Sequence, residues 1–242
     1  MIDYSKNIFL TFDIDWSPDF VVQRLVNILE KHNVSATFFC THHNKYFDSL
    51  KNHSLIELGL HPNYNLLLDL KSDRTAKQIV FELSSFYPEA VSIRSHSLFQ
   101  NSSLFFYYQQ LGIKLDSNTF IPEWSGIELK AYPEVNGVIR VPYFWEDDIH
   151  VCAIEQGIEK DWNTERYLNN DGLKVFDFHP IHVYLNTEKL SRYNDSKNFL
   201  HKKNKLDESI NKNADGSGMF LKHLIIDWKK QNGNFGKLKD LI

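Results

Sequence analysis

Short β-rich runs alternate with helical patterns along this chain, and each run closes on polar side chains. The runs lie at residues 8–13, 35–42, 55–62, 90–96, 112–118, 137–144 and 173–180. Strands that alternate with helices indicate βα units and a mainly parallel sheet. Seven such strands favour an α/β barrel over an open sheet.

Helix signals between these runs support the same architecture. Ser17 is placed to cap a helix whose first helical residue is Pro18, and Asp73 is placed to cap another. Residues 217–230 have the apolar spacing of a closing amphipathic helix. No linker, low-complexity tract or short repeat divides the sequence, so we expect a single domain over residues 1–242.

Charge and cysteine content argue against several classes of protein. The net charge is −4, from 27 basic and 31 acidic residues, which gives no electrostatic basis for binding nucleic acid or an anionic membrane. The first apolar run ends in aspartates, so we expect neither a signal peptide nor membrane insertion. Cys40 and Cys152 stand alone, which indicates no disulfide framework and favours the cytoplasm as location.

The polar residues that close the runs suit a metal-dependent hydrolase. In a βα barrel the carboxyl ends of the strands meet at one face, where residues distant in sequence form one site. The ends carry Asp13, Asp15, His42, His43, His61, Arg94, His96, Asp116, Tyr143, Trp145, Glu146, Asp147, Asp148, His179 and His182. Aspartate and histidine without a suitable cysteine predict Zn²⁺ or another first-row divalent ion. Any one of these residues alone would read as a helix cap or a core-edge side chain.

Five short segments in a set order carry a family resemblance. They read TFDID, ATFF, GLHPNYN, IRSHS and VFDFHP, between residues 8 and 182. Together they resemble the NodB-type polysaccharide deacetylases, carbohydrate esterase family 4, and most closely the branch found in O-antigen and surface-polysaccharide gene clusters. The resemblance implies a distorted (β/α)7 barrel, a divalent metal held by one aspartate and two histidines, and hydrolysis of an acetyl group on a sugar.

The resemblance gives the two aspartates of the first segment different roles. Asp13 matches the catalytic base, which takes a proton from water, and Asp15 matches the metal-binding aspartate. Family members place these residues next to each other, whereas Ile14 separates them here, so the assignment needs a local turn or twist. Arg94 matches the arginine that orients and ionises the base through a charge-assisted hydrogen bond.

The metal ligands depart from the family pattern at one position. His61 matches the first histidine, but Asn65 occupies the place of the second, and an amide is a poor zinc ligand. His96 is new at its position, and we expect it to supply the missing imidazole. The expected set is Asp15, His61 and His96, with Asn65 as the alternative third ligand. A backbone N–H near Ser97 is expected to stabilise the oxyanion.

The last segment supplies a general acid. His179 matches the histidine that protonates the leaving amine, although Asp177 stands where the family has leucine, and His182 is a competing candidate. Residues 142–148 have no counterpart in the family segments. Their aromatic and acidic side chains predict a wall that binds the sugar, and a loop with an anchored tryptophan is the alternative. The expected substrate-binding residues are Tyr143, Trp145, Glu146 and His182.

Two other functions stay open at this stage. One is a related metal amidohydrolase or deformylase that acts on a nucleotide-linked sugar. The other is a degenerate relative that binds carbohydrate without catalysis. In all three cases the expected partner is a carbohydrate, while the sequence does not indicate the sugar, its linkage or the oligomeric state.

Overall fold

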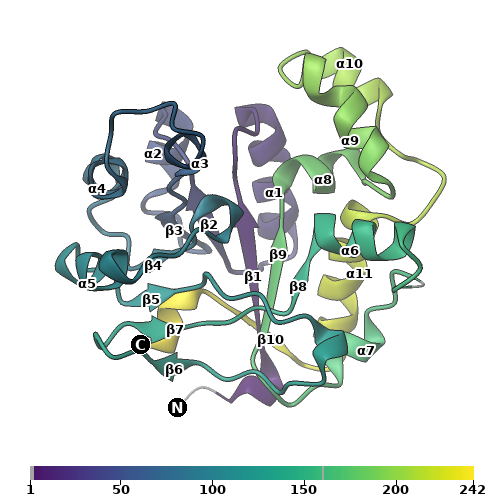
Figure 1. The fold of residues 1–242 in the computed structure, drawn as a ribbon. Helices are drawn as coiled ribbons and strands as arrows, with labels where there is room; N and C mark the ends of the chain where they lie inside the picture. Colours follow the sequence, from purple (N-terminus) through teal and green to yellow (C-terminus); the bar gives the residue numbers. More distant parts are fainter. Residues whose placement is uncertain (1–2, 160) are drawn as a thin grey trace.

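Ten strands form one sheet in the structure, a computed structural model that describes residues 3–159 and 161–242 (Figure 1). The strands are β1 (Asn7–Asp13), β2 (Ala36–Cys40), β3 (Ile56–Leu60), β4 (Ser92–Ile93), β5 (Leu115–Asp116), β6 (Tyr132–Pro133), β7 (Ile139–Arg140), β8 (Trp145–Glu146), β9 (Lys174–Phe178) and β10 (Asn234–Gly236). Their order across the sheet is β6-β7-β5-β4-β3-β2-β1-β9-β8, and β10 pairs with the start of β1. Every pair is parallel except β6 with β7.

The sheet curls into an incomplete barrel. Seven strands correspond to the seven predicted runs (β1 to β5, β7 and β9), and their pairings continue without a break from β9 through β1 to β7. Within the described part of the chain no pairing joins β6 to β8, so the barrel is open between them. The predicted distorted (β/α)7 barrel is confirmed, with the short strands β6, β8 and β10 as additions.

Three strands are much shorter than their sequence runs, and the run 90–96 forms only the two residues of β4. The runs 112–118 and 137–144 form ladders only over β5 and β7, which have two residues each. Asp116 Oδ1 accepts a hydrogen bond from the backbone N–H of Asn118 at 2.9 Å, and this local turn takes the chain out of the ladder. Pro142 lacks a backbone donor and ends the second run in the same way.

Helices flank the sheet and extend beyond it. They are α1 (Asp19–Lys31), α2 (Lys45–Leu50), α3 (Asn65–Leu68), α4 (Ala76–Phe86), α5 (Ser102–Gln110), α6 (Asp147–Glu155), α7 (Glu165–Leu168), α8 (Pro180–Leu185), α9 (Leu190–Ser196), α10 (Lys203–Glu208) and α11 (Ser217–Lys230). Helices α9 and α10 rise beyond the carboxyl end of β9, at the upper right of Figure 1. Among the described helices, none has both the length and the apolar character that crossing a membrane needs.

The closing helix is confirmed as α11, but two helix starts differ from the prediction. Helix α1 begins after Pro18 rather than after Ser17, and it has no side-chain cap. Thr75, not Asp73, caps α4. The Thr75 hydroxyl accepts the backbone N–H of Gln78 at 3.2 Å, and the Gln78 side chain accepts that of Thr75 at 2.7 Å. This reciprocal pair satisfies two free donors, which a single aspartate at position 73 cannot do.

An aromatic cluster joins α11 to the sheet beside the barrel opening. Phe220 of α11 is fully buried and stacks on Trp145 of β8, with ring centroids 4.5 Å apart. The same ring packs against Phe176 and Phe178 of β9 at 6.4 and 6.2 Å. These contacts hold the last helix against the two strands whose carboxyl ends enter the candidate site.

We therefore expect Phe220→Ala to lower the free energy of unfolding by about 3–5 kcal/mol, because it leaves a cavity among three rings. Phe81→Ala is the matched control, since Phe81 is 58% exposed on α4 and should cost less than about 1 kcal/mol. Denaturant unfolding of the two variants measures the difference. Equal losses would show that the cluster does not stabilise the fold.

Candidate active site

The backbone turn after β1, where Asp15 has a left-handed conformation, places the carboxylates of Asp13 and Asp15 close to His61. The strand ends at Asp13, Ile14 is buried, and Asp15 has a φ of 47°. Aspartate is one of the few residues that adopt this conformation readily. As a result, Asp13 Oδ2 lies 3.6 Å and Asp15 Oδ1 lies 3.4 Å from His61 Nε2. This is the local turn that the intervening residue required.

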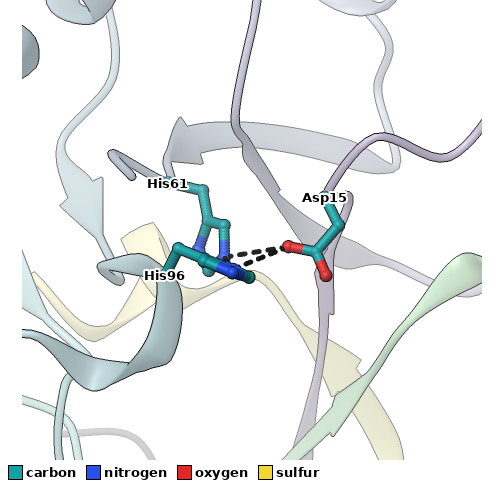
Figure 2. Close-up of side chains that lie close together, drawn as sticks. All are labelled: Asp15, His61 and His96. Atoms are coloured by element: carbon teal, nitrogen blue, oxygen red, sulfur yellow. Dashed lines mark hydrogen bonds and ion pairs between the residues drawn. The ribbon is translucent and has the colours of Figure 1, made fainter. Parts of the chain in front are cut away.

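Three side chains from three different loops converge in front of β1 (Figure 2). They are Asp15 after β1, His61 after β3 and His96 after β4. His96 Nδ1 lies 2.9 Å from Asp15 Oδ1 and 3.3 Å from His61 Nε2. Burial by itself would raise the pKa of Asp15, but the two imidazoles hold that pKa well below its usual range.

The distances and the free donor atoms of this cluster fit a divalent metal. Tetrahedral zinc ligands at 2.0–2.1 Å from the ion lie about 3.3 Å from one another, close to the three separations observed here. Asp15 Oδ1 is buried and has no hydrogen bond of good geometry. His61 Nδ1 donates to the backbone carbonyl of Arg94 at 2.7 Å, which leaves Nε2 with its lone pair facing the cluster.

Asn65, the alternative third ligand, points elsewhere. It begins α3, and its side-chain Nδ2 donates to Ser97 Oγ at 3.4 Å. None of its described hydrogen bonds reaches Asp15 or His61. The structure therefore brings together the expected set that contains His96, rather than the family pattern.

Arg94 is completely buried and connects Asp13 to the rest of the barrel. Its Nη1 donates to Asp13 Oδ1 at 3.1 Å and contacts Asp177 Oδ1 at 2.5 Å. The guanidinium lies between the rings of Phe39 and Tyr143, at 4.7 and 4.3 Å from their centroids. Buried charges need such partners, because removal from water costs several kcal/mol per ion.

Asp177 is a part of the site whose role the sequence analysis missed. Burial raises its pKa well above the usual range, although Arg94 opposes the shift. Thr11 Oγ1 also donates to Asp177 Oδ1 at 3.0 Å, while Asp177 Oδ2 has no hydrogen-bond partner. The available signal was an acidic residue between two phenylalanines near the end of a strand, where leucine was expected.

His179 is held by a second carboxylate that the sequence analysis left without a role. His179 Nδ1 lies 2.8 Å from Asp147 Oδ1, and the His179 backbone N–H donates to Asp147 Oδ2 at 3.0 Å. Burial alone would lower the pKa of His179, but Asp147 raises it well above the usual value. The other ring nitrogen, Nε2, lies 3.9 Å from Asp15 Oδ2, so a protonated imidazole faces the cluster.

The predicted sugar-binding wall is wrong for its aromatic members. Trp145 is 3% exposed and packs in the core, so it is the anchored tryptophan of the alternative reading. Tyr143 is 1% exposed, and its hydroxyl donates to Glu146 at 2.8 Å. His182 is buried behind His179, with Nδ1 3.1 Å from a threonine hydroxyl. Of the four expected residues, Glu146 alone is partly exposed, and its carboxylate lies within 4.8 Å of His179.

Comparison with known proteins agrees with this geometry. Residues 10–197 match the WbmS-like family of polysaccharide deacetylases. A candidate polysaccharide deacetylase involved in O-antigen biosynthesis, WbmS from Bordetella bronchiseptica, is 38% identical over 93% of this chain and 91% of that one, with a TM-score of 0.86.

More distant structures share the fold. The Bc1960 peptidoglycan N-acetylglucosamine deacetylase is 15% identical over 98% of this chain and 88% of its own, with a TM-score of 0.54. A candidate polysaccharide deacetylase from Mycobacterium smegmatis is 17% identical over 98% and 94%, also at 0.54. A comparison with curated protein sequences found no match. On the strength of the matched residues and the WbmS likeness, this chain belongs to the WbmS-like family of polysaccharide deacetylases.

Proposed function

We propose that the protein is a divalent-metal-dependent hydrolase that removes an acetyl group from an amino sugar during surface-polysaccharide biosynthesis. The observation that carries the proposal is the cluster of Asp15, His61 and His96, whose donor atoms lie 2.9–3.4 Å apart. The name of the WbmS relative supports an O-antigen sugar as substrate. The donor set of one carboxylate and two imidazoles supports zinc.

The proposed metal ion and Asp13 have separate roles in activating water. Asp15, His61 and His96 would hold a divalent ion, which would supply Lewis acidity to the acetyl carbonyl and to water. Asp13 accepts the proton of the attacking water at Oδ2, which lies next to His61. Arg94 donates to the other oxygen, Oδ1, and so orients the carboxylate and keeps it ionised.

The opposite side of the cluster carries the leaving-group chemistry. His179 carries a proton on Nε2 and transfers it to the sugar nitrogen as the C–N bond breaks, giving acetate and a free amine. Asp147 fixes the ring through Nδ1 and stabilises its protonated form. Ser97, with φ 56°, donates none of the described backbone hydrogen bonds, so its N–H is the donor available to the oxyanion.

Asp13 is placed to act as a base and His179 as an acid, with Arg94 and Asp147 holding them, and this favours an enzyme over a non-catalytic carbohydrate-binding relative. Acetate release from N-acetylated sugars by the metal-loaded protein is the direct measurement. Formate release from N-formylated sugars, with no acetate released, would favour the deformylase instead. Binding without release of either acid would favour the non-catalytic relative.

We expect His96→Ala to lower metal occupancy at least as much as His61→Ala, since both imidazoles face Asp15. Asn65→Ala is the matched control and should keep the metal, because its side chain hydrogen-bonds Ser97 instead. Metal content after dialysis gives the answer. Occupancy that survives His96→Ala and collapses in Asn65→Ala would restore the family pattern.

Asp13→Asn and Asp15→Asn should fail in different ways. Asp13→Asn should keep the metal yet lower turnover by about 10²–10⁴-fold, because an amide cannot accept the proton of water. Asp15→Asn should lose metal affinity first, so that excess metal restores part of the rate. Metal content and acetate release, each at low and saturating metal, separate the two. The opposite pattern would exchange the roles of the two aspartates.

Two substrates with different leaving groups test whether His179 acts as the general acid. His179→Ala should slow release of acetate from an N-acetyl sugar by about 10²–10⁴-fold. An activated aryl acetate has a leaving group that needs no proton, so its hydrolysis should change little. The ratio of the two rates in the variant and in the parent protein is the readout. Equal losses of hydrolysis rate on both substrates would mean that His179 supports metal binding or the fold instead of protonating the leaving group.

A further inference from the structure

An open groove adjoins the candidate metal centre at Trp16. It has a volume of about 680 Å³, within the range typical of small-molecule sites. Its walls include Trp16, Phe20, Gln23, His42, Asn44 and His201. Trp16 directly follows the proposed ligand Asp15, and its ring meets the ring of His96 edge-on at 5.2 Å. The groove therefore lies directly beside the candidate metal centre.

The indole of Trp16 is exposed without a packing reason. Half of the residue (50%) is open to solvent, and it belongs to neither of the hydrophobic clusters of the described chain. Phe20, the second residue of α1, is partly exposed in the same groove. Exposed aromatic surface with a polar rim marks ligand grooves, and a flat indole suits the apolar face of a pyranose ring.

Gln23, His42 and Asn44 give the groove hydrogen-bond donors and acceptors beside the carboxylate of Asp19. Gln23 is exposed on α1, and its side chain makes no hydrogen bond within the described residues. His42 Nδ1 lies 2.8 Å from the Thr41 hydroxyl, which leaves Nε2 free for a ligand. Side chains of this kind can donate hydrogen bonds to sugar hydroxyls or accept hydrogen bonds from them.

The charge of the groove argues against a phosphorylated occupant. No lysine or arginine is among its described lining residues, and Asp19 contributes a carboxylate. A nucleotide or lipid diphosphate carries negative charge, which this wall would repel. The chemistry therefore favours a neutral, hydroxylated ring over the diphosphate of an activated sugar.

We propose that this groove is a subsite for a second, uncharged pyranose unit of the substrate, with Trp16 as its stacking surface. The inference rests on the proposed function, since the adjacent unit carries the acetyl group at the metal centre. It makes the substrate a glycan of two or more units rather than a single nucleotide-linked sugar.

Acetate release by metal-loaded Trp16→Ala examines this subsite with two probes, N-acetylglucosamine and its β-1,4-linked tetrasaccharide. We expect kcat/KM for the tetrasaccharide to fall about tenfold, because roughly half an indole of apolar contact is lost. Release from the monosaccharide should be unchanged, and Trp16→Phe should keep most of the tetrasaccharide rate. Equal losses on both probes would overturn the proposal, since Trp16 would then only support His96.

Two further variants supply a control and a second test of the groove. Trp124→Ala removes another half-exposed indole (47%) that does not line the groove, so it should leave both rates unchanged. Gln23→Ala truncates a side chain without packing partners, and it should lower the tetrasaccharide rate severalfold while metal content stays constant. A tetrasaccharide rate unaffected by both Gln23→Ala and Trp16→Ala contradicts the subsite.

Calorimetry separates this inference from the proposed function. If the parent protein releases no acetate from either probe, the deacetylase reading fails, but tetrasaccharide binding still reports on the groove. Binding to the parent that weakens about tenfold in Trp16→Ala, and not in Trp124→Ala, supports the subsite. Absence of tetrasaccharide binding, or binding that is equal in the parent and Trp16→Ala, overturns it.

Discussion

The buried guanidinium of Arg94 is the interaction on which the site depends. A charge at 0% exposure is tolerated only with partners at close range, and Arg94 has Asp13 and Asp177 on the same Nη1. Ser117 completes the set, since its hydroxyl accepts from Nη2 at 2.9 Å. Removing the arginine would leave two buried carboxylates facing each other, so the fold and the ionisation of the base depend on the same residue.

Arg94 also couples the proton-transfer side of the site to the metal side. Its backbone carbonyl accepts from His61 Nδ1, while its side chain holds Asp13, so one residue at the end of β4 positions both groups. His179 is fixed independently, through Asp147 at the start of α6. The proposed base and the proposed acid thus have different immediate partners, Arg94 for Asp13 and Asp147 for His179.

The convergence of strand ends could be predicted from the sequence, because parallel βα units bring distant polar residues to one edge. The roles of Asp147 and Asp177 could not, since an acidic residue in sequence does not reveal which charged group it meets when buried. For Trp145, in contrast, the sequence predicted a binding role that its burial does not support. An aromatic residue among acids reads as a binding wall, yet its stacking on α11 places it in the core.

The two departures from the family pattern compensate for each other. The extra Ile14 forces a turn, and the left-handed Asp15 that follows carries its carboxylate to within 2.9 Å of His96 Nδ1. That separation is shorter than the 3.4 Å between Asp15 and His61, the ligand that the family keeps. The imidazole at position 96 therefore lies within reach of the Asp15 carboxylate, while the Asn65 side chain hydrogen-bonds Ser97 instead. The proposed set of one carboxylate and two imidazoles depends on this backbone turn, because residues at other sequence positions supply its members.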